Sequence, residues 1–181
     1  MKFAKNQLLK YRQKPMLLAE QINLEPIAKE RFPETVLALS PLEVEGQINY
    51  LDNEDIILKV TVKGTITVPS SRSLDAVELP INVTFEERYI EEVTRLSEFE
   101  ETDAVFVLEN DVLNVDDAIL DNIIANLPLQ ILTTEEENSD ILPSGNDWHV
   151  ISEETYKNEK MSDNSAKLDP RLAKLDDFFK E

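Results

Sequence analysis

The 181-residue chain contains no cysteine, three glycines and a single histidine. Without cysteine, disulfide bonds, thiolate zinc sites and cysteine nucleophiles are excluded. Three glycines cannot form a glycine-rich loop that binds phosphate. His149 is the only histidine, and there is no Gly-x-Ser-x-Gly motif, so the sequence offers no histidine-activated nucleophile. We therefore expect a protein that is not an enzyme, with no catalytic residue, no cofactor and no small-molecule substrate.

Long hydrophobic runs are also missing from the chain. No run approaches the roughly 18 apolar residues of a membrane span. The short apolar runs at 8–9 and 16–19 are separated by charges, unlike the apolar core of a signal peptide. We expect a cytoplasmic protein that does not contact a membrane.

The net charge of −19 is unevenly distributed along the chain. Residues 1–85 hold 10 basic and 11 acidic residues, whereas residues 86–181 hold 8 basic and 26 acidic residues. Such an anionic half repels phosphate backbones and attracts basic partners, although solubility alone also explains acidic surfaces. The first fourteen residues are different, because they carry no acid and five cations: Lys2, Lys5, Lys10, Arg12 and Lys14.

Apolar and polar residues alternate in three segments, 42–50, 58–68 and 77–85. Alternation with a period of two is typical of strands with one buried and one wet face. The turn-forming residues 52–55 predict a hairpin between the first two strands, so we expect an antiparallel meander. Pro80 is expected at an edge or a bulge, because proline cannot donate to a strand ladder. Lys59 and Lys63 are expected to form ion pairs with acids on neighbouring strands.

Shorter signals surround this meander. They predict helices at 26–31 and from Asp116 to Pro128, and strands at 36–39 and 104–108. The acids at 86–87 and 91–92 are expected to be exposed where the third strand ends. The predicted fold class is α+β: an antiparallel β-meander with a few short helices packed on it, followed by a flexible acidic C-terminal region that ends in a short helix.

The chain changes character near residue 133. Residues 134–167 are polar, charged and aperiodic, which favours a largely flexible acidic linker. In 168–181, Asp169 can cap a helix, Pro170 suits its first turn, and Leu172, Leu175 and Phe179 share one face. We therefore expect an α+β domain with a basic N-terminal segment at 1–133, a linker at 134–167 and a C-terminal helix at 168–181. The apolar face of that helix has two candidate docking sites, its own sheet or a partner protein.

The terminal segment Asp169-Pro170-Arg171-Leu172-Ala173-Lys174-Leu175 resembles the end of the YceD family of large ribosomal RNA subunit accumulation proteins. The stretch 68–81 resembles the family's central segment, and 126–129 and 145–148 resemble two further landmarks. Many members of the family carry Cys-x-x-Cys in the central segment, where this chain has Ser70 and Ser73. Hydroxyl groups do not bind zinc as thiolates do, and the acids at 135–140 lack the pattern of a calcium loop, so we expect no metal site.

The resemblance implies a non-enzymatic factor in large ribosomal subunit biogenesis that supports accumulation or processing of large-subunit (23S) ribosomal RNA. An acidic adaptor or chaperone for a basic ribosomal protein or assembly factor is the alternative, and a hydrolase is a distant third. The implied partners are ribosomal RNA, ribosomal proteins or assembly factors. Candidate RNA-binding or partner-binding residues are Lys5, Lys10, Arg12, Lys14, Arg72, Asp169, Arg171 and Lys174. Arg72 and Asp169 also have simpler roles, pairing with Asp75 and capping a helix.

Overall fold

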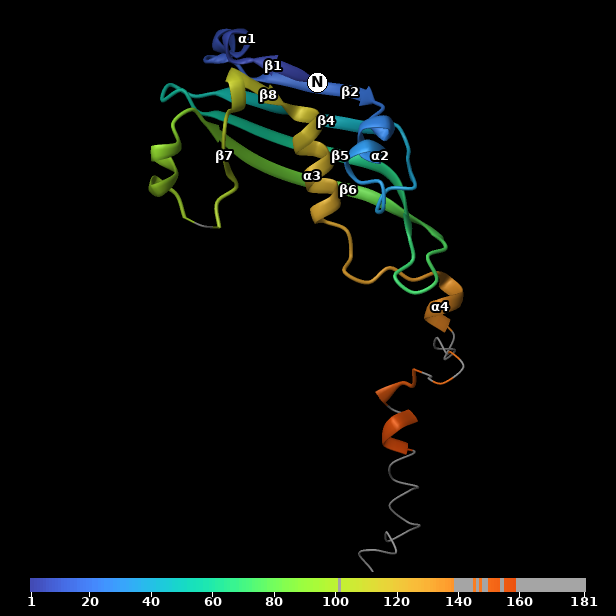
Figure 1. Ribbon diagram of the computed structural model, residues 1–181. Coiled ribbons are helices and arrows are strands. Elements are labelled where there is room, and N and C mark those ends of the chain that lie inside the picture. The colour runs from blue at the N-terminus through green and yellow to red at the C-terminus, as the bar shows by residue number, and fades with distance from the viewer. Residues whose placement is uncertain (101, 139–144, 146, 148–149, 154, 159–181) are drawn as a thin grey trace, which may run out of the picture. The chain divides into compact units, whose positions relative to one another are not determined.

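The three alternating segments form the central strands of a six-stranded sheet in a computed structural model of the protein (Figure 1). They are β4 (Leu42–Tyr50), β5 (Ile56–Pro69) and β6 (Ala76–Ile90), paired antiparallel in sequence order. A hydrogen bond from Leu51 N to Asp55 O, 2.8 Å long, closes the hairpin between β4 and β5. The predicted meander and the α+β fold class are confirmed.

The structure describes residues 1–100, 102–138, 145, 147, 150–153 and 155–158. The chain divides into two units, Met1–Thr133 and Thr134–Glu181. The sheet belongs to the first unit, and the second unit contains α4 (Thr134–Asn138).

Three further strands extend the sheet. Two of them confirm the strands predicted at 36–39 and 104–108, whereas the third, at 16–22, was not predicted. β2 (Met16–Ile22) pairs antiparallel with β4 at one edge, and β3 (Ala38–Leu39) pairs with β5. At the other edge β7 (Val105–Val107) runs parallel to β6, so the sheet is mixed. β1 (Lys2–Ala4) and β8 (Val112–Asn114) form a separate two-stranded sheet.

Short helices connect these strands. The longest of them in the first unit, α3 (Val115–Ala125), crosses one face of the sheet (Figure 1), and it confirms the helix predicted before Pro128. The helix predicted at 26–31 is α2 (Glu25–Arg31). The remaining helical segments of this unit are α1 (Lys5–Leu8), η1 (Leu9–Tyr11), η2 (Val93–Glu98) and η3 (Glu109–Asp111).

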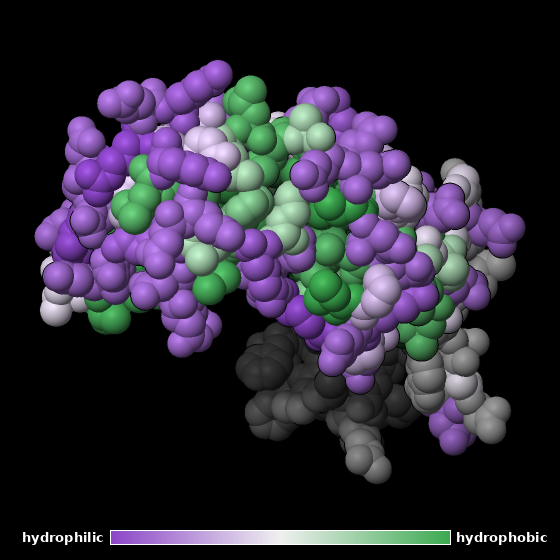
Figure 2. All heavy atoms as spheres, turned by 90° about the horizontal axis from the view of Figure 1, so that it is seen from above, coloured by the Kyte–Doolittle hydropathy of each residue, from purple (hydrophilic) through white to green (hydrophobic). Residues whose placement is uncertain are grey.

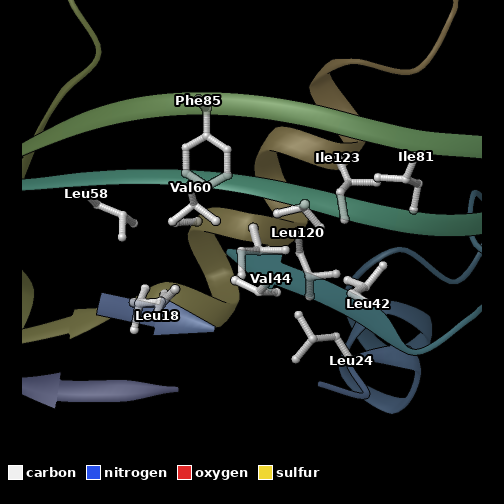
Figure 3. Close-up of a cluster of buried hydrophobic side chains, with 14 of the residues drawn as sticks. Leu18, Leu24, Leu42, Val44, Leu58, Val60, Ile81, Phe85, Leu120 and Ile123 are labelled. Carbon is white, nitrogen blue, oxygen red and sulfur yellow. The ribbon is translucent and has the colours of Figure 1, made fainter. Parts of the chain in front are cut away.

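The core lies between α3 and the sheet face that α3 covers, which we call the helix face. Alternate residues of β4 and β5, among them Leu42, Val44, Leu58 and Val60, are almost completely buried there. Figure 3 shows these side chains and those of Leu120 and Ile123 pointing toward one another. Burial of each such side chain contributes about 1.5–3 kcal/mol, so the core fixes which face of the sheet remains wet.

The opposite face of the sheet, which we call the open face, carries the polar residues of the alternating pattern. Lys59 forms the predicted cross-strand ion pair with Glu86, at 3.2 Å. Lys63 lies opposite Glu43 in the register, but the described residues include no carboxylate within ion-pairing distance of it. Hydrophilic residues make up most of the surface seen from above, with smaller hydrophobic areas between them (Figure 2).

One expectation about this sheet was wrong. β6 continues to Ile90, so Glu87 lies inside the strand rather than beyond its end. Its position places it on the helix face, in line with Ile81, Val83 and Phe85, and only 6% of it is exposed. Glu87 is therefore a buried carboxylate and not one of the exposed acids that the sequence pattern indicates.

Candidate functional site

The basic N-terminal residues do not form a free cationic arm. Lys5 forms ion pairs with Glu91 at 2.5 Å and Glu54 at 3.0 Å, and its side chain is 13% exposed. The hydrogen bond to Glu91 raises the pKa of Lys5 above its ordinary value. Arg12 lies 3.7 Å from Glu54 and 5.2 Å from the ring centroid of Tyr50. These two cations fasten the N-terminal segment to the β4–β5 hairpin and to the end of β6.

Lys10 and Lys14 have different surroundings. Both residues are exposed, and no carboxylate of the described residues lies within ion-pairing distance of either. The ammonium group of Lys10 lies 5.2 Å from the ring centroid of Tyr11. Of the four predicted N-terminal cations, Lys10 and Lys14 are thus the two that remain available to an anionic partner.

Arg72 lies in a tightly bonded loop between β5 and β6. The buried hydroxyl of Ser70 accepts hydrogen bonds from the backbone N–H of Arg72 at 3.0 Å and of Ser73 at 3.4 Å. Ser71 donates its N–H to Ile131 O at 2.7 Å, and its hydroxyl accepts the N–H of Ile131 at 3.0 Å. The side-chain hydroxyls of Ser70 and Ser73 thus accept hydrogen bonds from backbone N–H groups and stabilise this loop.

The predicted site residues Asp169, Arg171 and Lys174 lie outside the described residues, as do His149 and the terminal apolar stripe. Among the described candidate residues, Lys5 and Arg12 lie together around Glu54, whereas Arg72 lies in a separate loop. The proposed roles of the terminal residues stay predictions.

An acidic cavity that the sequence analysis did not single out lies between β6, β7 and α3. Its volume is about 280 Å³, and four carboxylates and one cation line it: Glu87, Glu109, Asp117, Asp121 and Arg31. Tyr89 and Phe106 add two rings whose centroids are 5.7 Å apart. The cavity thus combines aromatic faces with an excess of negative charge.

Glu87 is held firmly inside this cavity. Its carboxylate accepts the hydroxyl hydrogen of Tyr89 at 2.5 Å and an amide hydrogen of Asn122 at 2.6 Å. Burial and the hydrogen bond to Glu87 raise the pKa of Tyr89, so this phenol stays protonated and continues to donate. Asp117 and Asp121 hold the guanidinium group of Arg31 at 3.2 and 2.7 Å. This arrangement is suited to binding a cation and offers no obvious nucleophile.

A second, apolar cavity of about 210 Å³ lies further along β6. Leu79, Ile81 and Val83 of β6 line it, together with Ile123 of α3 and Leu127, which follows that helix. Figure 3 shows Ile81 and Ile123 side by side. We refer to this cavity as the apolar groove and to the one around Glu87 as the acidic cavity.

The sequence contained a partial signal for both cavities. Odd-numbered residues from Val77 to Phe85 all lie on the helix face. Extending this alternation by one more odd-numbered residue would have placed Glu87 on the same face. The position of α3 over these residues depends on contacts between distant parts of the chain, for which the alternation carries no information.

Two structural tests bear on metals and membranes. The described part of the chain contains no group of three or more histidine or acidic side chains arranged to hold a metal ion. Among the described helices, none is long and apolar enough to cross a membrane.

Comparison with known proteins gives a family and a relative, each of which matches most of the chain. The family model described as "Large ribosomal RNA subunit accumulation protein YceD" matches residues 58–179, which include most of β5 and all of the Ser70 loop, β6 and α3. The uncharacterized protein YlbN of Bacillus subtilis (strain 168) is 28% identical over 163 residues, which cover 90% of this chain and 87% of YlbN. No solved structure matches the chain. Since the family model spans well over half of the sequence, including the strands and loop just described, the chain belongs to the YceD family.

Proposed function

We propose that this protein is a non-enzymatic factor in the biogenesis of the large ribosomal subunit and supports the accumulation of large-subunit ribosomal RNA. The match of residues 58–179 to a family described by that role carries the proposal. We also propose a cytoplasmic location, because bacterial ribosomes are assembled there.

Direct contact with RNA is one way to fill this role. Lys10 and Lys14 are exposed cations, and Lys10 lies beside the ring of Tyr11. Cations near an aromatic ring suit phosphates and an unpaired base. Arg72, Arg171 and Lys174 remain proposed contacts. Lys5 is a weaker candidate than the sequence pattern indicates, because Glu54 and Glu91 already neutralise it.

An adaptor for a basic ribosomal protein or assembly factor is the second candidate. The acidic cavity favours it, since four carboxylates around one arginine leave negative charge for an incoming cation. The excess of acidic residues in 86–181 also attracts a basic partner, and it does so over longer distances than the cavity.

The proposed role is tested by deleting the gene and measuring the amounts of large-subunit and small-subunit ribosomal RNA. We expect the large-subunit RNA to fall relative to the small-subunit RNA, and expression of the wild-type protein to restore the ratio. An unchanged ratio would contradict the role.

A gel-shift experiment then separates the two candidates. Precursor and mature large-subunit RNA are titrated with the protein across a salt series, because phosphate contacts make binding strongly salt-dependent. Binding at low salt supports direct contact with RNA. Absence of a shift at every salt concentration, together with copurification of a ribosomal protein or assembly factor after ribonuclease treatment, supports the adaptor.

A further inference from the structure

β6 presents a long unpaired edge. β7 pairs with it through Arg88–Ile90, and no other strand of the described residues pairs with that side of β6 between Ala76 and Glu87. Strand edges of this length are templates for another strand, and proteins commonly protect them. The unpaired stretch from Ala76 to Glu87 is longer than a typical strand of about five or six residues.

The hydrogen bonds around β5 show which backbone groups face outward at this edge. Leu37 and Ser40 donate to the carbonyl oxygens of Thr67 and Thr65, so these two residues of β5 direct their backbone groups away from β6. Their partners on β6, Glu78 and Pro80, must then direct theirs away from β5. The uninterrupted register extends this to the other even-numbered residues, Ala76, Asn82, Thr84 and Glu86.

Pro80 fits this pattern. Its missing N–H lies on the outward side, so it removes no hydrogen bond to β5. Arg88 shows independently that even-numbered residues of β6 direct their backbone groups away from β5, because its N–H donates to Ala104 O on the β7 side at 2.9 Å. The outward donors available to a further strand are those of Ala76, Glu78, Asn82, Thr84 and Glu86.

The apolar groove lies directly beside this edge. Side chains of a strand added to β6 would alternate between the two faces of the sheet, and every second one would point toward the helix face. There it would meet Leu79, Val83 and Leu127, which are only partly buried. Asn126 is the one polar side chain in the groove lining, so apolar residues are favoured at these positions.

The acidic cavity lies at the end of the same edge, next to β7. α3 joins the two cavities, since Ile123 lines the groove and its neighbour Asn122 donates to Glu87 at 2.6 Å. Asp121 and Asp117 already bind one guanidinium group, that of Arg31. The remaining carboxylates, with the rings of Tyr89 and Phe106, suit a second lysine or arginine side chain.

We propose that the edge of β6 from Ala76 to Glu86 binds an extended basic segment of a partner protein as an additional strand. Apolar side chains at alternate positions of that segment fill the apolar groove, and a lysine or arginine reaches the acidic cavity. Charge complementarity selects a basic partner over a second copy of this acidic chain. The binding site follows from the geometry, whereas the origin of the partner in the ribosome rests on the proposed function.

The test uses the full-length protein and a short fluorescein-labelled peptide in which valine and threonine alternate, with lysine in place of the first and last valine, so that valines and lysines point to the same face of the sheet. We expect binding that weakens with salt, and no binding of a matched peptide with glutamate in place of lysine. Asn82→Pro removes one outward N–H at a position equivalent to Pro80, and it should weaken binding about threefold to tenfold, the effect of one hydrogen bond. Asn82→Ala keeps the N–H and should bind like the wild type. Glu109→Gln, which removes a carboxylate of the acidic cavity that does not bind Arg31, should weaken binding of the lysine peptide.

Amide hydrogen exchange on the same samples reports directly on the edge. We expect fast exchange at Asn82 and Thr84 in the free protein and slow exchange with peptide, while Ile81 and Val83, which face β5, exchange slowly in both. Protection of Asn82 and Thr84 without peptide would mean that this chain or a second copy covers the edge, and would overturn the proposal. So would equal weakening by Asn82→Ala and Asn82→Pro, or no peptide binding. If the peptide does not bind while gene deletion still lowers large-subunit RNA, the strand-binding proposal is contradicted and the proposed ribosomal role is not.

Discussion

Arg95 donates to the carboxylate of Asp55 at 2.6 Å, and Asp55 is completely buried. Arg88 reaches the same carboxylate from β6 at 3.0 Å, and its guanidinium group lies 5.3 Å from the ring centroid of Phe99. One carboxylate in the β4–β5 hairpin thus holds both β6 and the η2 segment. The hairpin was predicted from its turn-forming residues, but the burial of Asp55 depends on two arginines more than thirty residues away.

We predict that Asp55→Asn lowers the free energy of unfolding by about 3 kcal/mol, at the lower end of the range for broken buried ion pairs because both arginines are partly exposed. Chemical denaturation of the two proteins at neutral pH measures the difference. A change of less than about 0.5 kcal/mol, the level typical of surface substitutions, would contradict this role for Asp55.

The ion pairs of Asp55 with Arg95 and Arg88 also predict how the stability of the protein depends on pH. Burial alone would raise the pKa of Asp55, but the hydrogen bonds from Arg95 and Arg88 outweigh it and hold the pKa below its ordinary value of 3.8. A lowered pKa in the folded state contributes stability above the unfolded-state pKa, and this contribution is lost as pH falls through the folded-state value. The stability difference between wild type and Asp55→Asn should be constant above about pH 5 and should shrink below about pH 4. A difference that grew on acidification would have the wrong sign.

The N-terminal cations should separate into two functional groups. Lys5→Gln should lower the free energy of unfolding by about 1 kcal/mol, because the largely buried ammonium group loses both carboxylate partners. Its effect on RNA binding, if the protein binds RNA, should be small. Thermal unfolding and gel shifts of the same variant check the two statements.

Lys10→Gln combined with Lys14→Gln should behave in the opposite way. Stability should change little, and the slope of log K against log salt for RNA binding should decrease by about 2, one for each lost phosphate contact. An unchanged slope in a protein that still binds RNA would mean that Lys10 and Lys14 do not contact phosphates and that RNA binds to another part of the protein.

Gly46 and Gly64 offer a matched pair of packing tests. A Cβ at Gly46 would lie 2.2 Å from Lys59 O and 2.9 Å from Val60 Cα, both backbone atoms of the neighbouring strand. At Gly64 the closest atom, 2.6 Å away, is the terminal Cδ2 of Leu42. We predict that Gly46→Ala destabilises the protein by about 3 kcal/mol and Gly64→Ala by about 1 kcal/mol, because a leucine tip moves more easily than a paired strand. Equal losses in urea denaturation would show that the approach of β4 to β5 is less close than described.

Local pattern was enough to predict the central sheet and the short strands at 36–39 and 104–108, but neither β2 nor the way in which the edge strands pair. β4, β5 and β6 alternate over many residues, so burial on one face determines their register. The sequence pattern does not predict β2 because its residues break the alternation on both faces. Leu17 is an apolar residue on the open face, where it is 71% exposed, and Glu20 is a charged residue among the apolar positions of the other face. Nothing in three residues, Val105–Val107, encodes the parallel pairing of β7 with β6.

The candidate site could be predicted less well than the fold. Counting charge identified the N-terminal cations, but the acids that bind Lys5 lie 49 and 86 residues away in sequence. The apolar groove likewise needs α3 to lie over Leu79 and Val83, which is a tertiary contact. Composition indicates that the chain attracts basic partners, whereas the place where one would bind emerges only after folding.

The role that we propose for this member of the YceD family is to support the accumulation of large-subunit ribosomal RNA. The most direct measurement is the yield of pulse-labelled ribosomal RNA shortly after rapid depletion of the protein. We expect that newly made large-subunit RNA fails to accumulate while small-subunit RNA made in the same pulse accumulates normally. Normal accumulation of both RNAs, or an equal loss of both, would contradict it.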